Sequence, residues 1–152
     1  LLPKTINLVC DLPDDDGPTL AASTEVAQVI TNLLTNAADA MDRVGKITLS
    51  LQSIDVDADK GHNLQIIPGP YFLLSVTDKG GGMSPELIRR AFEPFYTTKD
   101  IGEGTGLGLS IAYGIVRGWN GAIRIDSEVG VGSTIDVYVP IVASEASTNV
   151  EG

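Results

Sequence analysis

The segment Tyr71–Met83, YFLLSVTDKGGGM, joins a β-forming run to an acidic residue and three glycines. Its first part, Tyr71–Thr77, is typical of a buried strand. Asp78 then follows the strand's carboxyl end, where α/β sheets form their ligand crevices. Glycines let the backbone approach a flat ligand, and a carboxylate accepts hydrogen bonds from the exocyclic amine of adenine. The segment predicts an adenine site, and an ordinary Asp-Gly turn is the alternative.

A second glycine-rich segment, Gly102–Gly108, runs directly into the periodic apolar residues of Leu107–Arg117, which predict a helix. Glycines at alternate positions free successive N–H groups to surround an anion, and a helix N-terminus adds positive potential. The spacing matches neither the P-loop nor the Rossmann fingerprint. The segment predicts a phosphate site to which Lys99 supplies a cation, and a flexible linker is the alternative.

Between Thr24 and Asp42, apolar residues recur at steps of three and four, which predicts an amphipathic helix. Asn32 and Asn36 are four residues apart and share one face of that helix. Amide oxygens are suitable ligands for Mg²⁺, which usually takes one or two protein ligands together with substrate phosphates. Exposed helix polarity, or capping of a neighbouring strand, is the alternative for this pair.

The segment Phe92–Lys99, FEPFYTTK, gathers three aromatic residues beside a stretch without apolar periodicity, Thr97–Thr105. That stretch is predicted to be a mobile loop. The aromatic residues are either part of the core or a hinge that packs differently with and without a ligand.

The remaining elements alternate between strands and helices. We expect strands at Thr5–Asp11, Lys46–Ile54, Gly121–Ser127 and Thr134–Pro140, a polar connection at Asp55–Pro70, and a short helix from Pro85 to Ala91 capped by Ser84. The last two strands form a hairpin, so a mixed sheet with helices on one face fits better than a purely parallel sheet. We predict one domain over residues 1–141 and a flexible polar tail over residues 142–152.

The composition excludes several kinds of site. The chain has 152 residues with one Cys and one His, which excludes an internal disulfide framework and a multi-His zinc site. Its net charge of −10 argues against nucleic acid as a partner. No apolar run approaches the roughly 18 residues of a membrane span. The sequence does not begin with Met, and we expect it to be part of a longer protein.

Taken in order, these elements resemble the motifs of the catalytic ATP-binding domain of sensor histidine kinases, a member of the GHKL superfamily with gyrase, MutL and the ninety-kilodalton heat-shock chaperones. The N box corresponds to Asn32–Ala37, the first glycine box to Asp78–Gly82, the F box to Phe92–Phe95, and the second glycine box to Gly104–Ser110. The resemblance extends from Thr5 to Pro140. It implies an α+β fold: a two-layer α/β sandwich with a mixed, mostly antiparallel sheet, helices on one face and a Gly-rich ATP lid.

The resemblance also implies a role for each matching position. Asn36 would coordinate Mg²⁺, and Asn32 would help to bind phosphate or metal. Asp78 would accept from the adenine amine, with Gly82 at the base of the site and Thr134 close to the ring. The implied catalytic residues are Asn32, Asn36 and Lys99, and the implied ATP-binding residues are Asn32, Asn36, Asp39, Asp78, Gly80, Gly82, Phe92, Phe95, Thr98, Lys99, Gly104, Thr105, Gly106, Leu107, Gly108, Leu109 and Thr134.

The chain departs from the family pattern at two places. Many members carry Lys or Arg three residues after the second Asn, where this chain has Asp39. The exchange removes a cation that faces the phosphates. Lys99 therefore becomes more important for binding them. The helical hairpin with a phosphoacceptor His is also missing, because His62 lies in a polar segment without the helical context that the family uses.

The implied function is binding of Mg·ATP and transfer of the γ-phosphoryl group to a His on a separate dimerisation domain of the same protein. A response regulator would receive the group from that domain. The fragment is expected to bind ATP and ADP as a monomer and to be cytoplasmic, whether or not the parent protein is anchored in a membrane.

Three other functions share the fold. A clamp ATPase would have a Glu at the position of Asn32 to activate water, because an amide cannot take that proton. A serine kinase of the anti-sigma type lacks the motif at Phe92–Phe95. A nucleotide-binding pseudo-kinase would not be expected to keep nearly every binding group, as this chain does.

Overall fold

The computed structural model describes residues 6–11, 23–41, 45–93 and 108–141. The predictions for the loop at Thr97–Thr105 and for the tail after residue 141 lie outside these ranges. Among the described residues, no helix combines the length and the apolar composition that crossing a membrane requires.

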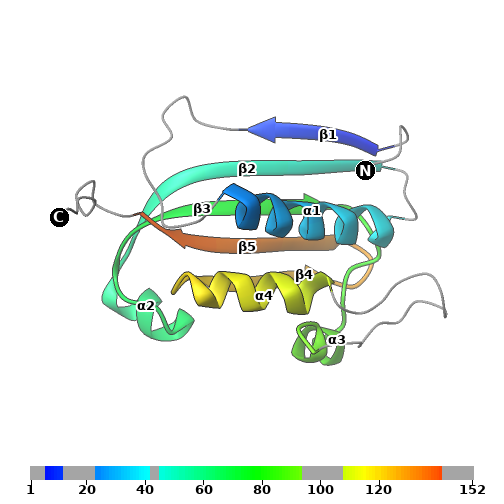
Figure 1. Cartoon of the computed structure of the whole chain (residues 1–152). Helices are drawn as coiled ribbons and strands as arrows, with labels where there is room; N and C mark the ends of the chain where they lie inside the picture. The colour runs from blue at the N-terminus through cyan, green and yellow to red at the C-terminus, as the bar shows by residue number, and fades with distance from the viewer. Residues whose placement is uncertain (1–5, 12–22, 42–44, 94–107, 142–152) are drawn as a thin grey trace.

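Five strands form one sheet in the order β1-β2-β3-β5-β4 (Figure 1). Strand β1 pairs with β2 in parallel, and the other three pairings are antiparallel, so the predicted mixed, mostly antiparallel sheet is confirmed. The elements are β1 (Ile6–Asp11), α1 (Ser23–Ala40), β2 (Gly45–Val56), α2 (Ala58–Leu64), β3 (Gly69–Asp78), α3 (Pro85–Arg90), α4 (Gly108–Gly118), β4 (Ala122–Glu128) and β5 (Gly132–Pro140).

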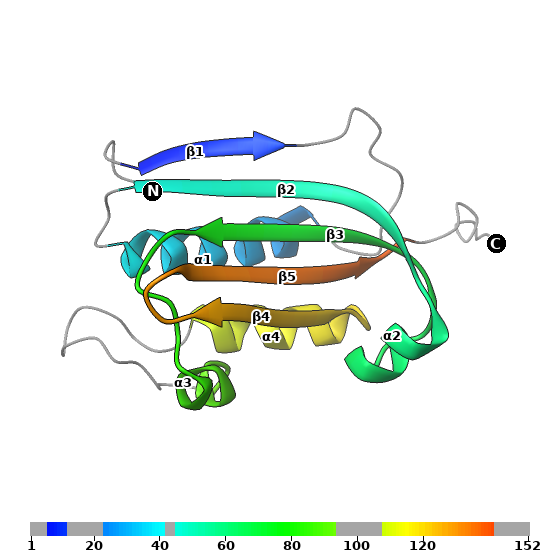
Figure 2. The ribbon, with the colours of Figure 1, turned by 180° about the vertical axis from the view of Figure 1, so that it is seen from behind.

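Helices α1 and α4 cover one face of the sheet, and the view from behind shows the strands in front of both helices (Figure 2). Along α1, Val29, Leu33 and Ala37 are buried at helical spacing, as the sequence predicts. They belong to a single core with alternate residues of the strands, among them Ile47, Leu49, Leu74, Val76, Ile135 and Val137. The predicted arrangement, with helices on one face, is therefore confirmed.

A hydrogen bond between side chains joins the two helices of that layer. The indole N–H of Trp119, just after α4, donates to the carboxylate of Glu25 in the first turn of α1 at 2.7 Å. The Trp119 side chain is buried and belongs to the core. The bond supplies the polar partner that a buried indole requires and fixes the C-terminal end of α4 against α1.

The opposite face of the sheet is polar towards the Asp78 end, whereas at the other end Tyr71 and Tyr138 form a buried apolar cluster on that face. Thr77 and Thr134 lie opposite each other across β3 and β5, and their hydroxyl groups are 3.0 Å apart. Ser75 donates to Asp136 at 2.6 Å one step further along the same pair of strands. This alternation of apolar and polar residues is what a sheet covered on one face requires.

The segment Asp55–Pro70 contains a helix that the sequence did not reveal. Strand β2 continues to Val56, and α2 then begins with Asp57 as its N-cap, whose side chain accepts from the Lys60 N–H at 2.8 Å. The helix ends at Gln65 in a left-handed conformation. Seven residues are too few for a periodic apolar pattern, so the expected polar connection was wrong. Helix α3 and its Ser84 cap are confirmed.

Candidate functional site

Asp78 is the last residue of β3, a strand that is paired on both sides. It lies on the same face as Leu74 and Val76, and only 3% of its surface is exposed. The Gly80 N–H donates to its Oδ1 at 2.8 Å, and the Ser133 backbone N–H also donates to the carboxylate. Among the described residues, no Lys or Arg forms an ion pair with it.

Burial raises the pKa of Asp78 above its ordinary value, and the two backbone N–H groups lower the pKa in opposition. A carboxylate has about four acceptor positions, of which these donors use two. The side chain is therefore a fixed acceptor in a site of low polarity, with capacity for a further donor. This arrangement suits the amine of an adenine ring.

The glycines after Asp78 allow two close backbone contacts. A Cβ at Gly80 would lie 2.4 Å from the carbonyl oxygen of Ala40, at the end of α1. A Cβ at Gly82, where φ is +77°, would lie 2.1 Å from the carbonyl oxygen of Glu128. These glycines let the end of β3 pack against α1 and β4, a structural requirement that exists without any ligand.

The structure places Ser133, and not Thr134, beside Asp78. Ser133 is the cross-strand partner of Asp78 and is buried, whereas Thr134 pairs with Thr77 on the opposite face. The Ser133 hydroxyl lies 2.7 Å from that of Ser127 on β4. The sequence analysis missed both serines. The alternation of core residues along Thr134–Pro140, extended by one residue, would have found Ser133.

The predicted polar residues of α1 lie beside its apolar stripe. Asn32, Asn36 and Asp39 are half-buried and follow the helical spacing of one face. Asn32 accepts from the Gln28 side chain at 3.1 Å. Asn36 and Asp39 lie in the last two turns of α1. At the end of this helix, the Gly81 N–H donates to the Ala40 carbonyl oxygen at 3.4 Å. They are thus at the same end of the molecule as Asp78.

Phe92 follows α3, packs against the core, and stacks on Tyr113 of α4, with ring centroids 4.8 Å apart. Leu109 is buried in the core, and Gly108 is the first residue of α4. The remaining predicted ATP-binding residues lie outside the described ranges: Phe95, Thr98, Lys99, Gly104, Thr105, Gly106 and Leu107. Within the described ranges, no three His, Cys, Asp or Glu side chains gather as metal ligands.

Comparison with known proteins identifies the family and two relatives of the chain. Residues 21–143 match the family of histidine kinase-, DNA gyrase B- and HSP90-like ATPases. The chain is 41% identical to the sensor kinase CckA of Brucella abortus, over 95% of this chain and 15% of that protein. It is 33% identical to sporulation kinase E of Bacillus subtilis, over 91% of this chain and 17% of that protein. The chain thus spans less than a fifth of either relative.

Solved structures lead to the same family. The catalytic domain of the histidine kinase ThkA superposes with a TM-score of 0.70 and 26% identity, over 91% of this chain and 82% of that one. Full-length ShkA, solved in complex with AMPPNP, superposes with a TM-score of 0.69 and 25% identity, over 91% of this chain and 26% of that one. The chain therefore belongs to the family of histidine kinase-, DNA gyrase B- and HSP90-like ATPases, as an ATP-binding catalytic domain of the sensor histidine kinase type.

Proposed function

We propose that this domain binds Mg·ATP with its adenine ring at Asp78 and passes the γ-phosphoryl group to a His on a separate dimerisation domain of the parent protein. The phosphoryl group then moves on to a response regulator in the cytoplasm. The observation that carries the proposal is the Asp78 carboxylate, which is buried, oriented by two N–H groups and not paired with a cation in the described part of the chain.

The Asp78 carboxylate explains a preference for adenine. The amine of adenine donates to a carboxylate, whereas guanine presents a carbonyl oxygen at the same ring position and is repelled. Ser133 is the buried cross-strand partner of Asp78, and its hydroxyl lies 2.7 Å from that of Ser127. The ring is thereby held between the end of β3 and the hairpin of β4 and β5.

The residues that would hold Mg²⁺ and the phosphates are Asn36, Asn32 and Lys99. The amide oxygen of Asn36 is the kind of hard ligand that Mg²⁺ accepts, so Asn36 would hold the metal together with the substrate phosphates. When bound, Mg²⁺ neutralises charge on the β- and γ-phosphates. This requires few protein ligands, which agrees with the lack of a carboxylate cluster in the described ranges.

Asn32 favours transfer over hydrolysis. An amide does not accept a proton from water, so Asn32 cannot activate water as a nucleophile. In transfer, an imidazole nitrogen forms the new bond to the γ-phosphorus while the bond to the bridging oxygen breaks and ADP leaves with the electron pair. The acceptor itself must be held in line, because misplacement by about 1 Å costs around a hundredfold in rate.

Calorimetry with ATP and GTP tests the adenine assignment. The chain without substitutions should bind ATP more tightly than GTP. Asp78→Ala should weaken ATP binding by about 1–3 kcal/mol. Asp126→Ala is the matched control, because Asp126 is an exposed acid of β4 on the opposite face of the sheet. Equal affinity of the unsubstituted chain for ATP and GTP would show that Asp78 does not distinguish adenine from guanine.

The metal assignment has its own test. Asn36→Ala should weaken nucleotide binding in the presence of Mg²⁺ far more than binding in EDTA. Gln52→Ala, on β2, is the control for loss of an exposed amide. Equal losses with and without Mg²⁺ would make Asn36 a structural residue.

Labelled ATP tests the transfer step. Incubated alone with Mg²⁺ and labelled ATP, the chain should remain unlabelled and hydrolyse ATP slowly. A His-bearing hairpin from the parent protein, added in trans, should become labelled. Label on His62, or fast turnover without the hairpin, would favour an independent enzyme.

A further inference from the structure

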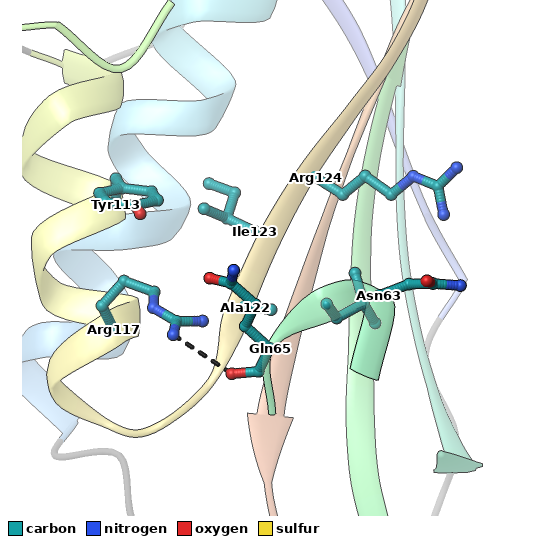
Figure 3. A pocket seen from close by; sticks show the side chains of 8 residues that line it. Asn63, Gln65, Tyr113, Arg117, Ala122, Ile123 and Arg124 are labelled. Atoms are coloured by element: carbon teal, nitrogen blue, oxygen red, sulfur yellow. Dashed lines mark hydrogen bonds between the residues drawn. The ribbon is translucent and has the colours of Figure 1, made fainter. Parts of the chain in front are cut away.

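A cavity of about 480 Å³ lies at the end of the sheet away from Asp78. Its walls come from α2, α4 and the start of β4, and they include Asn63, Gln65, Tyr113, Arg117, Ala122 and Arg124 (Figure 3). Ala122 pairs with Tyr138, whereas the Asp78 end of the hairpin pairs Glu128 with Gly132. No residue that we assign to ATP lines this cavity, so it is a separate site.

Arg117 is held in place by two carbonyl oxygens. Its Nη1 donates to the Gly121 oxygen at 2.7 Å and its Nη2 donates to the Gln65 oxygen at 3.3 Å (Figure 3). A guanidinium has five N–H donors, so donors remain for a ligand. The two bonds fix the orientation of the group before any ligand arrives and reduce the entropy lost on binding.

The cavity carries positive charge in a strongly acidic chain. The chain has a net charge of −10, yet the charged residues around this cavity are Arg117 and Arg124. Within the described ranges, neither arginine forms an ion pair. Asp136, the cross-strand partner of Arg124, accepts from Ser75 instead. Two arginines at a concave surface that pair with no carboxylate in the described part of the chain are suited to an anion.

Tyr113 adds a flat surface for a ring. It is 41% exposed although it stacks on Phe92, and it lines the cavity beside Arg117. Figure 3 shows Tyr113 and Arg117 projecting from α4, with Arg124 projecting from β4 on the other side of that strand. Aromatic rings stack on such a side chain, and the amides of Asn63 and Gln65 offer donors and acceptors for a ring edge.

We propose that this cavity binds a small phosphate ester that carries a planar ring, a ligand of the nucleotide class, as a second site distinct from the one at Asp78. The cavity volume is within the range of small-molecule sites. Arg117 anchors the phosphate, Arg124 contacts the ligand from the other side of β4, and the ring stacks on Tyr113. Tyr113 also stacks on Phe92, the first residue of the F box, so the ring that would receive the ligand is packed against that motif.

The other candidate for this surface is an acidic peptide that adds a strand to the free edge of β4. The cavity is lined by side chains of α2 and α4 as well as by the start of β4, so its lining extends beyond the strand edge. A compact ligand therefore fits better than an extended chain, and the peptide becomes one arm of the test.

The test is calorimetry of the chain with GMP in the absence of any other nucleotide. GMP is chosen because its base carries a carbonyl group where Asp78 requires an amine. We expect saturable binding, with ribose 5-phosphate weaker and inorganic phosphate weaker again. Failure of GMP to bind overturns this proposal, whereas ADP binding itself reports separately on the proposed function.

Single variants locate the site. Arg117→Gln and Arg124→Gln should each weaken GMP binding about tenfold or more, the effect of a hydrogen bond to a charged group. Arg89→Gln removes the same charge on α3, where Arg89 pairs with Glu86, and should change GMP affinity by less than about twofold. Unchanged ADP affinity confirms that each variant is folded. Since Arg124 is exposed, its variant keeps the test valid even if Arg117→Gln fails to fold.

Four outcomes would overturn the proposal. Unchanged GMP affinity in Arg124→Gln would mean that the ligand binds elsewhere. An equal loss of GMP affinity in Arg89→Gln would mean that only the net charge of the chain matters. Inorganic phosphate that binds as tightly as GMP would remove the role of the ring. An acidic peptide that binds in an Arg124-dependent manner, without any binding of GMP, would assign the surface to strand addition.

Discussion

At one end of the sheet a carboxylate is buried among backbone N–H groups, and at the other end two tyrosines close an apolar cluster. Asp78, Ser127 and Ser133 form the polar end, where the carboxylate pairs with no cation of the described residues. Val56, Tyr71, Ala122 and Tyr138 are buried at the opposite end, next to a cation held by carbonyl oxygens. The comparison teaches that burial of the Asp78 carboxylate lowers the stability of the fold but provides a fixed acceptor. The apolar cluster at the other end stabilises the fold.

The glycine contacts at the Asp78 end provide the largest test. Gly82→Ala would push a Cβ into the Glu128 carbonyl oxygen and force Ala into a left-handed conformation. We expect the free energy of unfolding to fall by about 3 kcal/mol or more, measured by urea denaturation.

Gly114→Ala is the control for this change, because Gly114 is helical and a Cβ there meets nothing within 4 Å. This variant should be about 0.5–1 kcal/mol more stable than the parent. A mild effect of Gly82→Ala, comparable in size to that of Gly114→Ala, would mean that the strand ends are not packed as described.

The ionisation of Asp78 gives the next effect. Because burial raises its pKa, the folded chain holds the proton more tightly than the unfolded chain does. The stabilising contribution is complete below the unfolded pKa of about 3.9 and is lost as the pH rises through the folded pKa. The stability of the parent relative to Asp78→Asn should therefore decline with rising pH across that window.

Urea denaturation at a series of pH values from acid to neutral measures this difference. A constant difference between parent and Asp78→Asn at every pH would show that the buried carboxylate costs the fold nothing.

A smaller effect separates the two faces of β5. Ser133→Ala removes the hydroxyl that contacts Ser127 and should weaken ADP binding by about 1 kcal/mol. Thr134→Val removes the bond to Thr77 on the opposite face and should leave ADP affinity unchanged. If calorimetry gives the reverse order, Thr134 is the residue that reaches the ring.

The smallest effect is expected at the apolar end. Tyr71→Phe removes the hydrogen bond from its hydroxyl to the Ile67 carbonyl oxygen, 2.6 Å long, and keeps the ring in the cluster. The free energy of unfolding should fall by about 0.5–1 kcal/mol, with ADP affinity unchanged. A change in ADP affinity would show that the two ends are coupled through the sheet.

Most of the fold could be predicted from the sequence because its long elements are periodic. Helix α1 follows from the spacing of Val29, Leu33 and Ala37, and the hairpin of β4 and β5 from alternation around a glycine-rich turn. Helix α2 could not be predicted, because a seven-residue helix depends on its Asp57 cap and on a left-handed Gln65, and neither produces a periodic pattern.

The site could be predicted in its main residue and not in its neighbours. Asp78 follows from its place at the end of a buried strand. The choice between Ser133 and Thr134 depends on strand register, and a shift of one residue moves a side chain to the opposite face. The glycines were interpreted as space for a ligand, but their contacts with Ala40 and Glu128 depend on tertiary packing that no local pattern encodes.

The bond between Trp119 and Glu25 has an optical consequence. The chain has a single Trp, and its indole is buried between the two helices of the core. With excitation that avoids the four tyrosines, emission originates from Trp119 alone, and its shift to longer wavelength would report the separation of α1 from α4. The domain thus carries an internal fluorophore for its helical layer.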